Sequence, residues 1–258
     1  MRLFCKVIFV LGCRLIVVSG DACNIESLLV SGHALPDYSF QYERNSNVLS
    51  CASFCLRAEV CASFQLDTNT RICFLNLKNS TSGPGIQIRP GFIYSDINGW
   101  PKGLSGPCGN HSCSNEQMCI VPRSGDTECK PVRFMDIKLN TRTSYSFIHK
   151  FRMWPWAQEY CQKEGGQLAR IKTAEENTFI GNMTEIFGSD FRHHWVGGVY
   201  HADDDTWRWP DGTLILYYAW GETHPRRVNG STMTVQPNFG WTDEPSHYKF
   251  YFICEFEE

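Results

Sequence analysis

The strongest apolar cluster of the chain lies at its start. Two basic residues precede an apolar run over 7–18, and small residues follow it. This order of basic, apolar and small residues is typical of a secretory signal peptide. The run is interrupted by Arg14 and is shorter than the ~20 apolar residues that a membrane-spanning helix needs. The pattern predicts a signal peptide over residues 1–20, cleaved after Gly20 or Ala22, and no later stretch reaches spanning length.

The polar and apolar positions of residues 23–98 predict a helix followed by a hairpin. Asn47 is a favourable N-cap for a helix over 48–58, in which two cysteines four residues apart share one face. Residues 61–66 and 71–75 are apolar runs separated by a polar turn, which predicts two strands. We therefore expect a helix that disulfides cross-link to a hairpin.

Residues 99–131 show no regular apolar period. Their prolines and glycines interrupt any periodic element, and they contain four cysteines. A stretch of this length is too short to have a hydrophobic core of its own. We expect a small disulfide-stapled linker that acts as a rigid spacer.

Residues 132–258 predict an α+β domain. A short strand over 145–147 precedes a helix that begins near Pro155 and ends at a Gly-Gly pair. One face of this helix carries Trp156, Ala157, Tyr160 and Cys161. A second helix begins with the capping box Thr173 to Glu176 and ends at Gly188; its expected buried stripe is Phe179, Ile180, Met183 and Phe187. The later apolar runs predict strands at 195–199, 207–209, 240–243 and 251–255.

Composition and charge support a folded, modular protein. The 258 residues are 42% apolar and 14% aromatic, too aromatic for a disordered chain. The net charge is −3, and it becomes −6 without residues 1–20, which carry three basic and no acidic side chains. No overall positive field would attract phosphate backbones, so we expect no nucleic-acid partner.

Cysteine usage divides the chain in the same places. Eleven of the 13 cysteines lie outside residues 1–20, in groups at 23–73 and 108–129 and as the distant pair Cys161 and Cys254. In an exported chain this density predicts disulfides, and the lack of C-x2-C pairs argues against zinc. The odd number leaves one cysteine without a partner in the chain.

The cysteine spacing of residues 23–98, with the sequence Cys-Ala-Ser-Phe from position 61, resembles a PAN/apple domain. The resemblance implies the disulfides Cys51–Cys73 and Cys55–Cys61. The apple form of the family links its first cysteine to one near the domain end, and no cysteine follows Gly91 there. We expect Cys23 either to stay unpaired, which allows a disulfide-linked dimer, or to pair with a linker cysteine.

The cysteines of the linker resemble the first part of an EGF-like module. This resemblance implies the pairs Cys108–Cys119 and Cys113–Cys129, although the closing pair of that module is absent. The four cysteines by themselves permit three connectivities.

The C-terminal residues resemble a C-type lectin-like domain. The family's motifs occur in order as Trp156-Ala157 with Cys161, Gly165-Gly166-x-Leu168-Ala169, Trp195-Val-Gly-Gly, Trp209-Pro-Asp-Gly212, Trp241-Thr-Asp243 and Ile253-Cys254-Glu255. The resemblance implies a C-type lectin-like fold and a disulfide Cys161–Cys254. The family's second disulfide would fall near Thr232 and Ser246, and neither is Cys, so we expect the long loop to be freer than usual.

The resemblance also locates the family's Ca²⁺ site, and this chain departs from it. Sugar-binding members hold the ion with an acidic-Pro-amide triplet, an intervening acid and the Asn-Asp after a Trp. Here the triplet becomes His224-Pro225-Arg226, and Asp243 is the one strong ligand that remains. Arg227 adds a second positive charge, and only Glu222 offers a replacement acid. We therefore expect no Ca²⁺, no other metal and no cofactor.

Loss of that site does not exclude a sugar ligand. Arginines pair well with sialate or sulfate. Trp220, Trp241, Tyr217 and Tyr218 either stack on sugar faces or belong to the core, and the sequence leaves both interpretations open. The candidate ligand-binding residues are Glu222, His224, Arg226, Arg227, Trp241 and Asp243.

Three other groups of residues have simpler explanations. The acidic run 203–205 predicts a solvated turn, and His193 and His194 point to opposite faces of a strand, so they do not suit one ion. Four N-glycosylation sequons, expected on exposed loops, begin at Asn79, Asn110, Asn182 and Asn229. No common catalytic motif occurs, so we expect no enzyme activity.

These observations favour a secreted, extracellular recognition protein. In this hypothesis the lectin-like domain binds a glycan or glycoprotein without the family's Ca²⁺ site, and the PAN-like module adds further contacts. The alternative is a matrix or adhesion protein that uses both modules for protein–protein contacts. The expected partners are glycans and other extracellular proteins, without nucleic acid or a membrane span.

Overall fold

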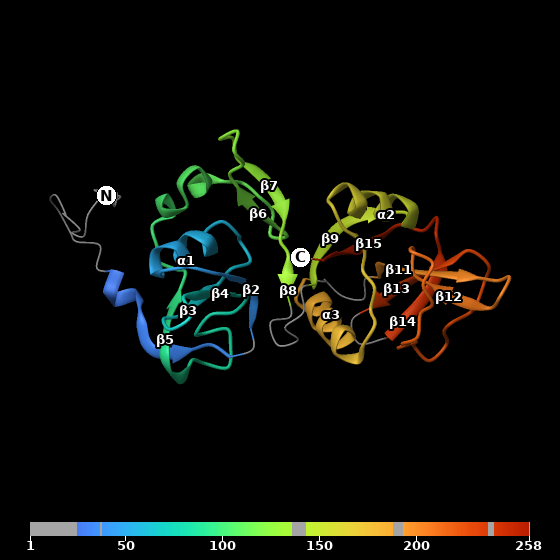
Figure 1. The fold of residues 1–258 in the computed structure, drawn as a ribbon, viewed down its shortest axis with the longest axis horizontal. Helices are drawn as coiled ribbons and strands as arrows, with labels where there is room; N and C mark the ends of the chain where they lie inside the picture. The colour runs from blue at the N-terminus through green and yellow to red at the C-terminus, as the bar shows by residue number, and fades with distance from the viewer. Residues whose placement is uncertain (1–24, 37, 136–142, 188–192, 237–239, 258) are drawn as a thin grey trace. The chain divides into compact units, whose positions relative to one another are not determined.

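The computed structural model describes residues 25–36, 38–135, 143–187, 193–236 and 240–257 (Figure 1). The chain divides into two compact units, one of residues 1–113 with 119–129 and the other of 114–118 with 130–258. The predicted signal peptide and Cys23 lie outside the described residues. Within the described ranges, no helix has the length and apolar character to cross a membrane.

The first unit is built on a five-stranded sheet with strand order β1-β5-β3-β4-β2. The strands are antiparallel, and the central hairpin is the predicted pair β3 and β4. The elements are a 3₁₀ turn η1 (Ile25–Leu28), β1 (Val30–Ala34), β2 (Ser39–Glu43), α1 (Val48–Cys55), β3 (Ser63–Asp67), β4 (Ile72–Asn76) and β5 (Gln87–Asp96). Strands β1, β2 and β5 were not predicted, because Gly or Pro interrupts the apolar residues of β1 and β5 and β2 has only two apolar residues.

The capping of α1 was predicted correctly, but its length was not. The Asn47 side chain accepts the Ser50 N–H at 3.0 Å, and the Ser50 hydroxyl accepts the Asn47 N–H at 2.8 Å. The helix ends at Cys55, three residues before the expected end at Ala58. The disulfides Cys51–Cys73 and Cys55–Cys61 tie the helix to β4 and to the start of β3, as the resemblance implied.

The linker is more ordered than its composition indicates. A 3₁₀ segment η2 (Lys102–Asn110), kinked at Gly106, precedes the two-stranded sheet of β6 (Gln117–Ile120) and β7 (Glu128–Pro131). The disulfides are Cys108–Cys119 and Cys113–Cys129, and three of these four sulfur-bearing residues form a small buried cluster. The Cys119 N–H donates to the Arg57 carbonyl at 2.8 Å, so part of this stretch packs on the first unit.

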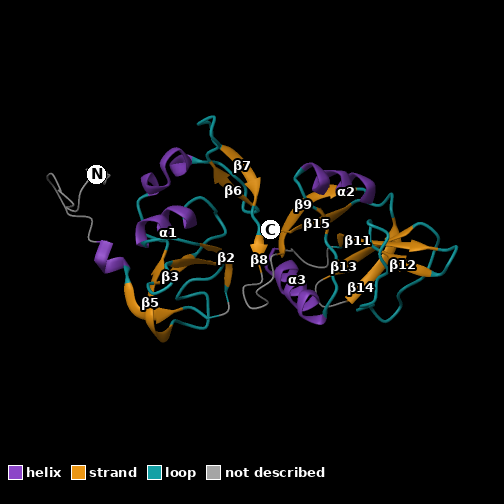
Figure 2. Ribbon diagram, viewed as in Figure 1, coloured by secondary structure: helices purple, strands orange, loops and turns teal. Residues whose placement is uncertain are grey.

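The second unit contains an eight-stranded mixed sheet whose main path runs β14-β13-β11-β15-β9-β8 (Figure 2). Strands β11 and β15 are parallel, and the other pairs are antiparallel. The elements are β8 (Phe134–Met135), β9 (Thr143–Arg152), α2 (Trp154–Lys163), β10 (Gln167–Leu168), α3 (Ala174–Phe187), β11 (His194–His201), β12 (Thr206–Arg208), β13 (Ser231–Gln236), β14 (Gly240–Pro245) and β15 (Phe250–Glu257). Helix α2 packs against β10, β11 and β15, and α3 contacts β13.

The core of this unit surrounds the disulfide Cys161–Cys254, which joins α2 to β15. Trp195 and Phe252 are fully buried beside it. A Cβ on Gly166 would lie 2.3 Å from the Glu255 carbonyl oxygen, so only glycine fits where the chain leaves α2.

Two sequence-based expectations for the second unit were wrong. Trp156 does not pack inward with Ala157 and Cys161; it is 47% exposed, and Arg152 covers its ring. Strand β13 was not predicted, because its sequence Ser-Thr-Met-Thr-Val-Gln is half hydroxyl residues, yet its first five residues are buried. Cross-strand hydrogen bonds such as that between Thr234 and Thr242 satisfy these hydroxyls.

Candidate functional site

A long loop, residues 209–230, connects β12 to β13 and carries most of the candidate ligand-binding residues. Its first half follows neighbouring strands: the Ile215 N–H donates to the Trp207 carbonyl at 2.9 Å, and the Trp241 N–H donates to the Ala219 carbonyl at 2.8 Å. Gly240 permits this close approach, because a Cβ there would lie 2.8 Å from the Ala219 oxygen and its φ is +76°. The loop is therefore fixed along its backbone.

A cluster of aromatic rings connects the long loop to the core of the unit. The Trp220 ring lies 4.9 Å from Trp207, 5.9 Å from Trp241 and 6.1 Å from Tyr218, measured between centroids. Trp207 and Trp241 are buried, whereas Tyr218 is 44% exposed. The Trp241 indole N–H donates to Asn177 Oδ1 on α3 at 2.7 Å. The cluster thus extends from the core to the surface, and Tyr218 is its outer member.

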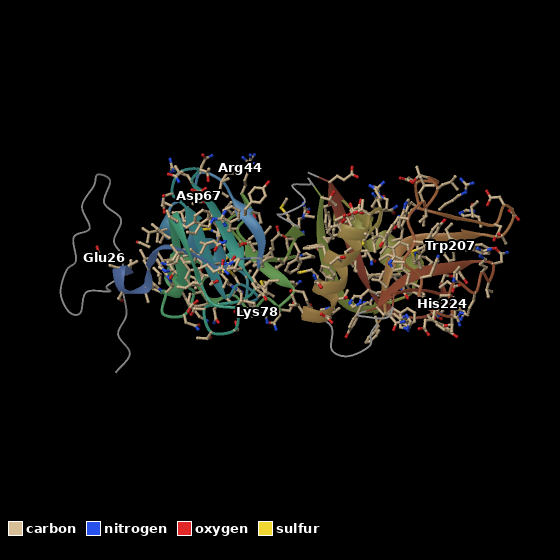
Figure 3. All side chains as sticks on the ribbon, turned by 90° about the horizontal axis from the view of Figure 1, so that it is seen from below. Glu26, Arg44, Asp67, Lys78, Trp207 and His224 are labelled. Atoms are coloured by element: carbon tan, nitrogen blue, oxygen red, sulfur yellow. A yellow bond between two sulfur atoms is a disulfide. The ribbon has the colours of Figure 1, made fainter. Side chains whose placement is uncertain are left out.

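Asp243 on β14 is the polar centre of the loop and is buried. Its Oδ1 accepts the Arg226 backbone N–H at 2.8 Å and lies 2.7 Å from His224 Nδ1. Its Oδ2 accepts the Arg227 backbone N–H at 3.0 Å. One carboxylate therefore holds three successive parts of the loop, and Figure 3 shows His224 on this C-terminal part of the chain.

The two arginine side chains lie at the surface and have acidic partners. Arg226 Nη2 lies 2.7 Å from Glu244 Oε1, and its side chain is 49% exposed. Arg227 Nη1 lies 3.0 Å from Asp205 Oδ2, and its side chain is 55% exposed. The Tyr200 hydroxyl donates to the other oxygen of Asp205 at 2.8 Å, which ties the loop to the turn before β12.

These contacts determine the charge of Asp243. Burial by itself raises the pKa of a carboxyl group, but the Arg226 N–H and the His224 ring stabilise the charged form. The pKa of Asp243 is consequently below its ordinary value. The site is thus built around a buried anion that the protein's own donors neutralise.

The structure separates the six predicted site residues into three kinds. His224, Arg226, Arg227 and Asp243 come together in one hydrogen-bonded group. Trp241 is 1% exposed, which agrees with its interpretation as a core residue. Glu222 is exposed, and within the described ranges it makes no ion pair with this group.

Sequence reasoning missed the partners of this group. Glu244, Asp205 and Asn177 each bind a residue of the loop or its aromatic cluster, from three different elements. The acidic turn was predicted as solvated, and residues 203–205 are indeed exposed in a turn. Nothing in the local sequence links that turn to Arg227, because 22 residues separate the two partners.

The remaining candidates behave as structural or surface residues. His193 stacks on Phe250, whereas His194 is buried beside His149, so the two rings face different neighbours as expected. Within the described part of the chain, no cluster of His, Cys, Asp and Glu could hold a metal ion. Asn110 and Asn229 are exposed, Asn79 is partly buried, and Asn182 lies in α3 rather than in a loop.

Strand pairing occupies the place of the family's second disulfide, whose absence predicts a freer loop. Strands β13 and β14 pair from Ser231↔Pro245 to Gln236↔Gly240, with Thr232 opposite Glu244. The Thr232 hydroxyl donates to the Glu244 carbonyl at 3.2 Å. Backbone pairing and Asp243 hold the base of the loop together.

Comparison with known proteins identifies both units. The family profile described as Lectin C-type domain matches residues 151–256, and the one described as PAN domain matches residues 23–98. A protein named Lectin from Pleurodeles waltl is 31% identical over 143 residues, which are 53% of this chain and 81% of that protein. Lithostathine-1-alpha of Homo sapiens is 30% identical over 118 residues, 44% of this chain and 71% of the relative.

Two further similarities were found. Asialoglycoprotein receptor 2 of Homo sapiens is 29% identical over 54% of this chain and 45% of the receptor. A crystal structure of human lithostathine aligns with a TM-score of 0.42 and 28% identity, over 45% of this chain and 85% of that one.

The chain therefore belongs to the C-type lectin domain family and carries a PAN domain at its N-terminal side. The relatives are lectins and receptors rather than enzymes, which supports a recognition role without catalysis.

Proposed function

We propose that the C-type lectin domain binds glycans through the long loop without a Ca²⁺ ion at the family's usual position, and that the protein acts as a secreted recognition protein. The observation that carries this proposal is the saturation of Asp243. Both of its oxygens accept hydrogen bonds from the loop itself, at 2.7–3.0 Å.

The residues present do not fit a Ca²⁺ ion. Calcium requires six to eight oxygen ligands at 2.3–2.6 Å, mostly from carboxylates. At the matching positions this chain has the His224 ring and the Arg226 guanidinium, and the latter lies 3.8 Å from the Asp243 carboxylate. These donors occupy the carboxylate and add positive charge where a cation would bind. We therefore derive no step through a metal ion.

The outer surface of the loop offers a different chemistry for sugars. Tyr218 presents an exposed ring beside Trp220, and apolar sugar faces stack on such rings. The exposed guanidinium groups of Arg226 and Arg227 are suited to a carboxylate or sulfate. Their present partners form surface ion pairs, which contribute little free energy, so a ligand anion displaces them at small cost. An acidic sugar such as a sialylated glycan satisfies both requirements.

The relatives support a carbohydrate or glycoprotein ligand. One of them is named a lectin and another an asialoglycoprotein receptor. The five disulfides of the described residues, together with the N-terminal apolar run, support an extracellular location.

A glycan array tests the proposal with the secreted, disulfide-intact full chain. The array is run once with Ca²⁺ and once with EDTA. We expect the same acidic glycans to bind in both buffers. Signals that disappear in EDTA would show that the loop rearranges around an ion, and reproducible silence in both buffers would favour the alternative of protein–protein recognition in a matrix or adhesion role.

Two single variants then locate the site. We expect Arg226→Ala and Tyr218→Ala each to weaken binding of the array hits about tenfold, because each removes one strong contact. Lys172→Ala, an exposed residue before α3, is the matched control and should leave binding unchanged. Equal binding by Arg226→Ala and the parent chain would contradict the assignment of the loop.

A further inference from the structure

A second surface of the lectin unit combines unpaired cations with exposed aromatic rings. It is formed by the end of β9, the start of α2 and the turn between β14 and β15. We call it the β9 patch and define it by Lys150, Arg152, Trp156, Tyr248 and Lys249. None of these residues belongs to the long loop.

Strand pairing and ring contacts make the β9 patch continuous. Arg152 on β9 pairs with Phe250 on β15, and the Phe250 ring lies 6.2 Å from Tyr248. The Arg152 guanidinium carbon lies 4.8 Å from the centre of the Trp156 ring. The Trp154 N–H donates to the Ser246 carbonyl at 3.0 Å, which holds the start of α2 against the turn. The patch therefore consists of three adjoining segments rather than scattered side chains.

The cations of the β9 patch differ from the other basic residues near the sheet. Arg170, Arg208, Arg226 and Arg227 each form an ion pair with a carboxylate. Lys150, Arg152 and Lys249 have no such partner among the described residues. Two acids of the same unit have other partners, since Glu116 pairs with His149 and Glu159 with Lys163. Three positive charges are thus available to an external anion, in a chain whose net charge is −3.

The aromatic rings of the patch are unusually open. Trp156 and Tyr248 are 47% and 46% exposed, although large aromatic side chains normally bury most of their surface. The apolar surface exposed between Lys150 and Trp156 also includes Met153, which is 41% exposed. Flat rings interleaved with cations suit sugar rings that carry anionic groups.

We propose that the β9 patch binds a sulfated polysaccharide. Sulfate groups accept charge-assisted hydrogen bonds from Lys150, Arg152 and Lys249, and sugar faces stack on Trp156 and Tyr248. This site is separate from the long loop and does not depend on the glycan specificity of that loop. A chain of repeated sulfated sugars can engage all three segments at once, and this gives affinity to contacts that are individually weak.

The test uses the full chain and immobilised heparin as the sulfated polysaccharide. We expect saturable binding that weakens as salt rises, because exposed charges are screened beyond ~8 Å at physiological ionic strength. The variant Lys150→Gln/Arg152→Gln/Lys249→Gln should weaken binding about tenfold, since it removes three surface charge contacts. Trp156→Ala should weaken it several-fold without changing the net charge.

Matched controls separate the β9 patch from charge in general. Lys102→Gln/Lys163→Gln/Lys172→Gln changes the net charge by the same amount at exposed positions elsewhere and should change binding less than twofold. Thermal unfolding of each variant confirms that it is folded.

Three outcomes would overturn the proposal. Parent-like binding by the patch variant would show that other residues bind the polysaccharide. An equal loss in the charge-matched control would show a nonspecific electrostatic attraction. Patch-dependent binding to vesicles that contain phosphatidylserine, without binding to heparin, would assign the patch to a membrane surface instead.

Discussion

At the scale of single residues, the chemistry of the lectin unit depends on how one buried carboxylate is satisfied. Asp243 is 1% exposed, and its hydrogen-bond partners are the His224 side chain and two backbone amides. A buried charge is tolerated only when it is paired and hydrogen-bonded. Asp243 therefore determines the shape of the long loop instead of binding a ligand directly.

Asp243→Asn is expected to destabilise the lectin unit by about 1–3 kcal/mol, because it replaces charge-assisted hydrogen bonds with weaker neutral ones in a buried place. The measurement is the free energy of unfolding in denaturant. Glu222→Gln, an exposed acid of the same loop, is the control and should stay within about 0.5 kcal/mol of the parent. Similar values for both variants would contradict the structural role of Asp243.

The same carboxylate predicts a dependence of stability on pH. The pKa of Asp243 is lower in the folded protein than its ordinary value near 3.8. Its contribution is therefore fully present above the ordinary pKa and is lost as the pH falls through the lower, folded value. The difference in melting temperature between the parent and Asp243→Asn should be constant from pH 7 to about pH 5 and should shrink below about pH 4.

Gly240→Ala should perturb the loop through the backbone. The added Cβ would meet the Ala219 oxygen at 2.8 Å, at a φ of +76° that side chains rarely adopt. We expect a loss of stability of at least about 1 kcal/mol. Gly181→Ala is an informative contrast, since its Cβ meets nothing within 4 Å in the interior of α3, and it should stabilise the unit by about 0.5–1 kcal/mol.

At the scale of elements, the disulfide between α2 and β15 closes a longer loop than any other disulfide of the described residues. Cys161 and Cys254 are 93 residues apart, whereas the other bridges span 6 to 22 residues. Closure of a long loop removes more conformational freedom from the unfolded chain than closure of a short one. This single bridge holds together the first helix and last strand of the unit.

Cys161→Ala/Cys254→Ala is therefore expected to cost the lectin unit about 4–5 kcal/mol, by the loop-entropy relation. Loss of the folded unit at 37 °C would agree with this estimate, since whole domains are stable by only about 5–15 kcal/mol. Limited proteolysis and thermal unfolding measure this loss of stability directly. An unchanged melting temperature would show that packing around Trp195 and Phe252 suffices.

At the scale of the whole molecule, the disulfides of the described residues account for all but one of the cysteines outside residues 1–20. Ten of the eleven cysteines outside residues 1–20 form five disulfides. The four linker cysteines pair with one another, which removes the alternative in which Cys23 joins that group. Cys23 lies outside the described residues, and it stays the predicted site of a bond to a second chain.

We expect the secreted protein to migrate as a disulfide-linked dimer on a non-reducing gel, and Cys23→Ser to convert it to a monomer without changing the melting temperature of either unit. A monomer that reacts with a thiol reagent at Cys23 would instead show a free cysteine, and the dimer hypothesis would then be wrong.

Part of the candidate site was accessible from the sequence. The order of motifs around Trp156, Cys161, Trp195 and Cys254 was sufficient for the fold class, and the change from an acidic triplet to His224-Pro225-Arg226 indicated an altered ion site. The burial of Trp241 and the exposure of Tyr218 were not accessible, because residue type alone does not separate a core aromatic ring from a surface one. Only their packing on Trp220 distinguishes them.

The sequence by itself indicated the PAN-like and lectin-like domains and the loss of acidic ligands, and its resemblance to known families implied the disulfide pairs, because motifs depend on residue type and spacing. The tertiary structure alone decided what replaces those ligands. Asp205, Glu244 and Asn177 lie far from their partners in the chain, and only the folded sheet brings them to the loop. The β9 patch arises in the same way, since Arg152 and Tyr248 are separated by most of the domain and become neighbours through the pairing of β9 with β15.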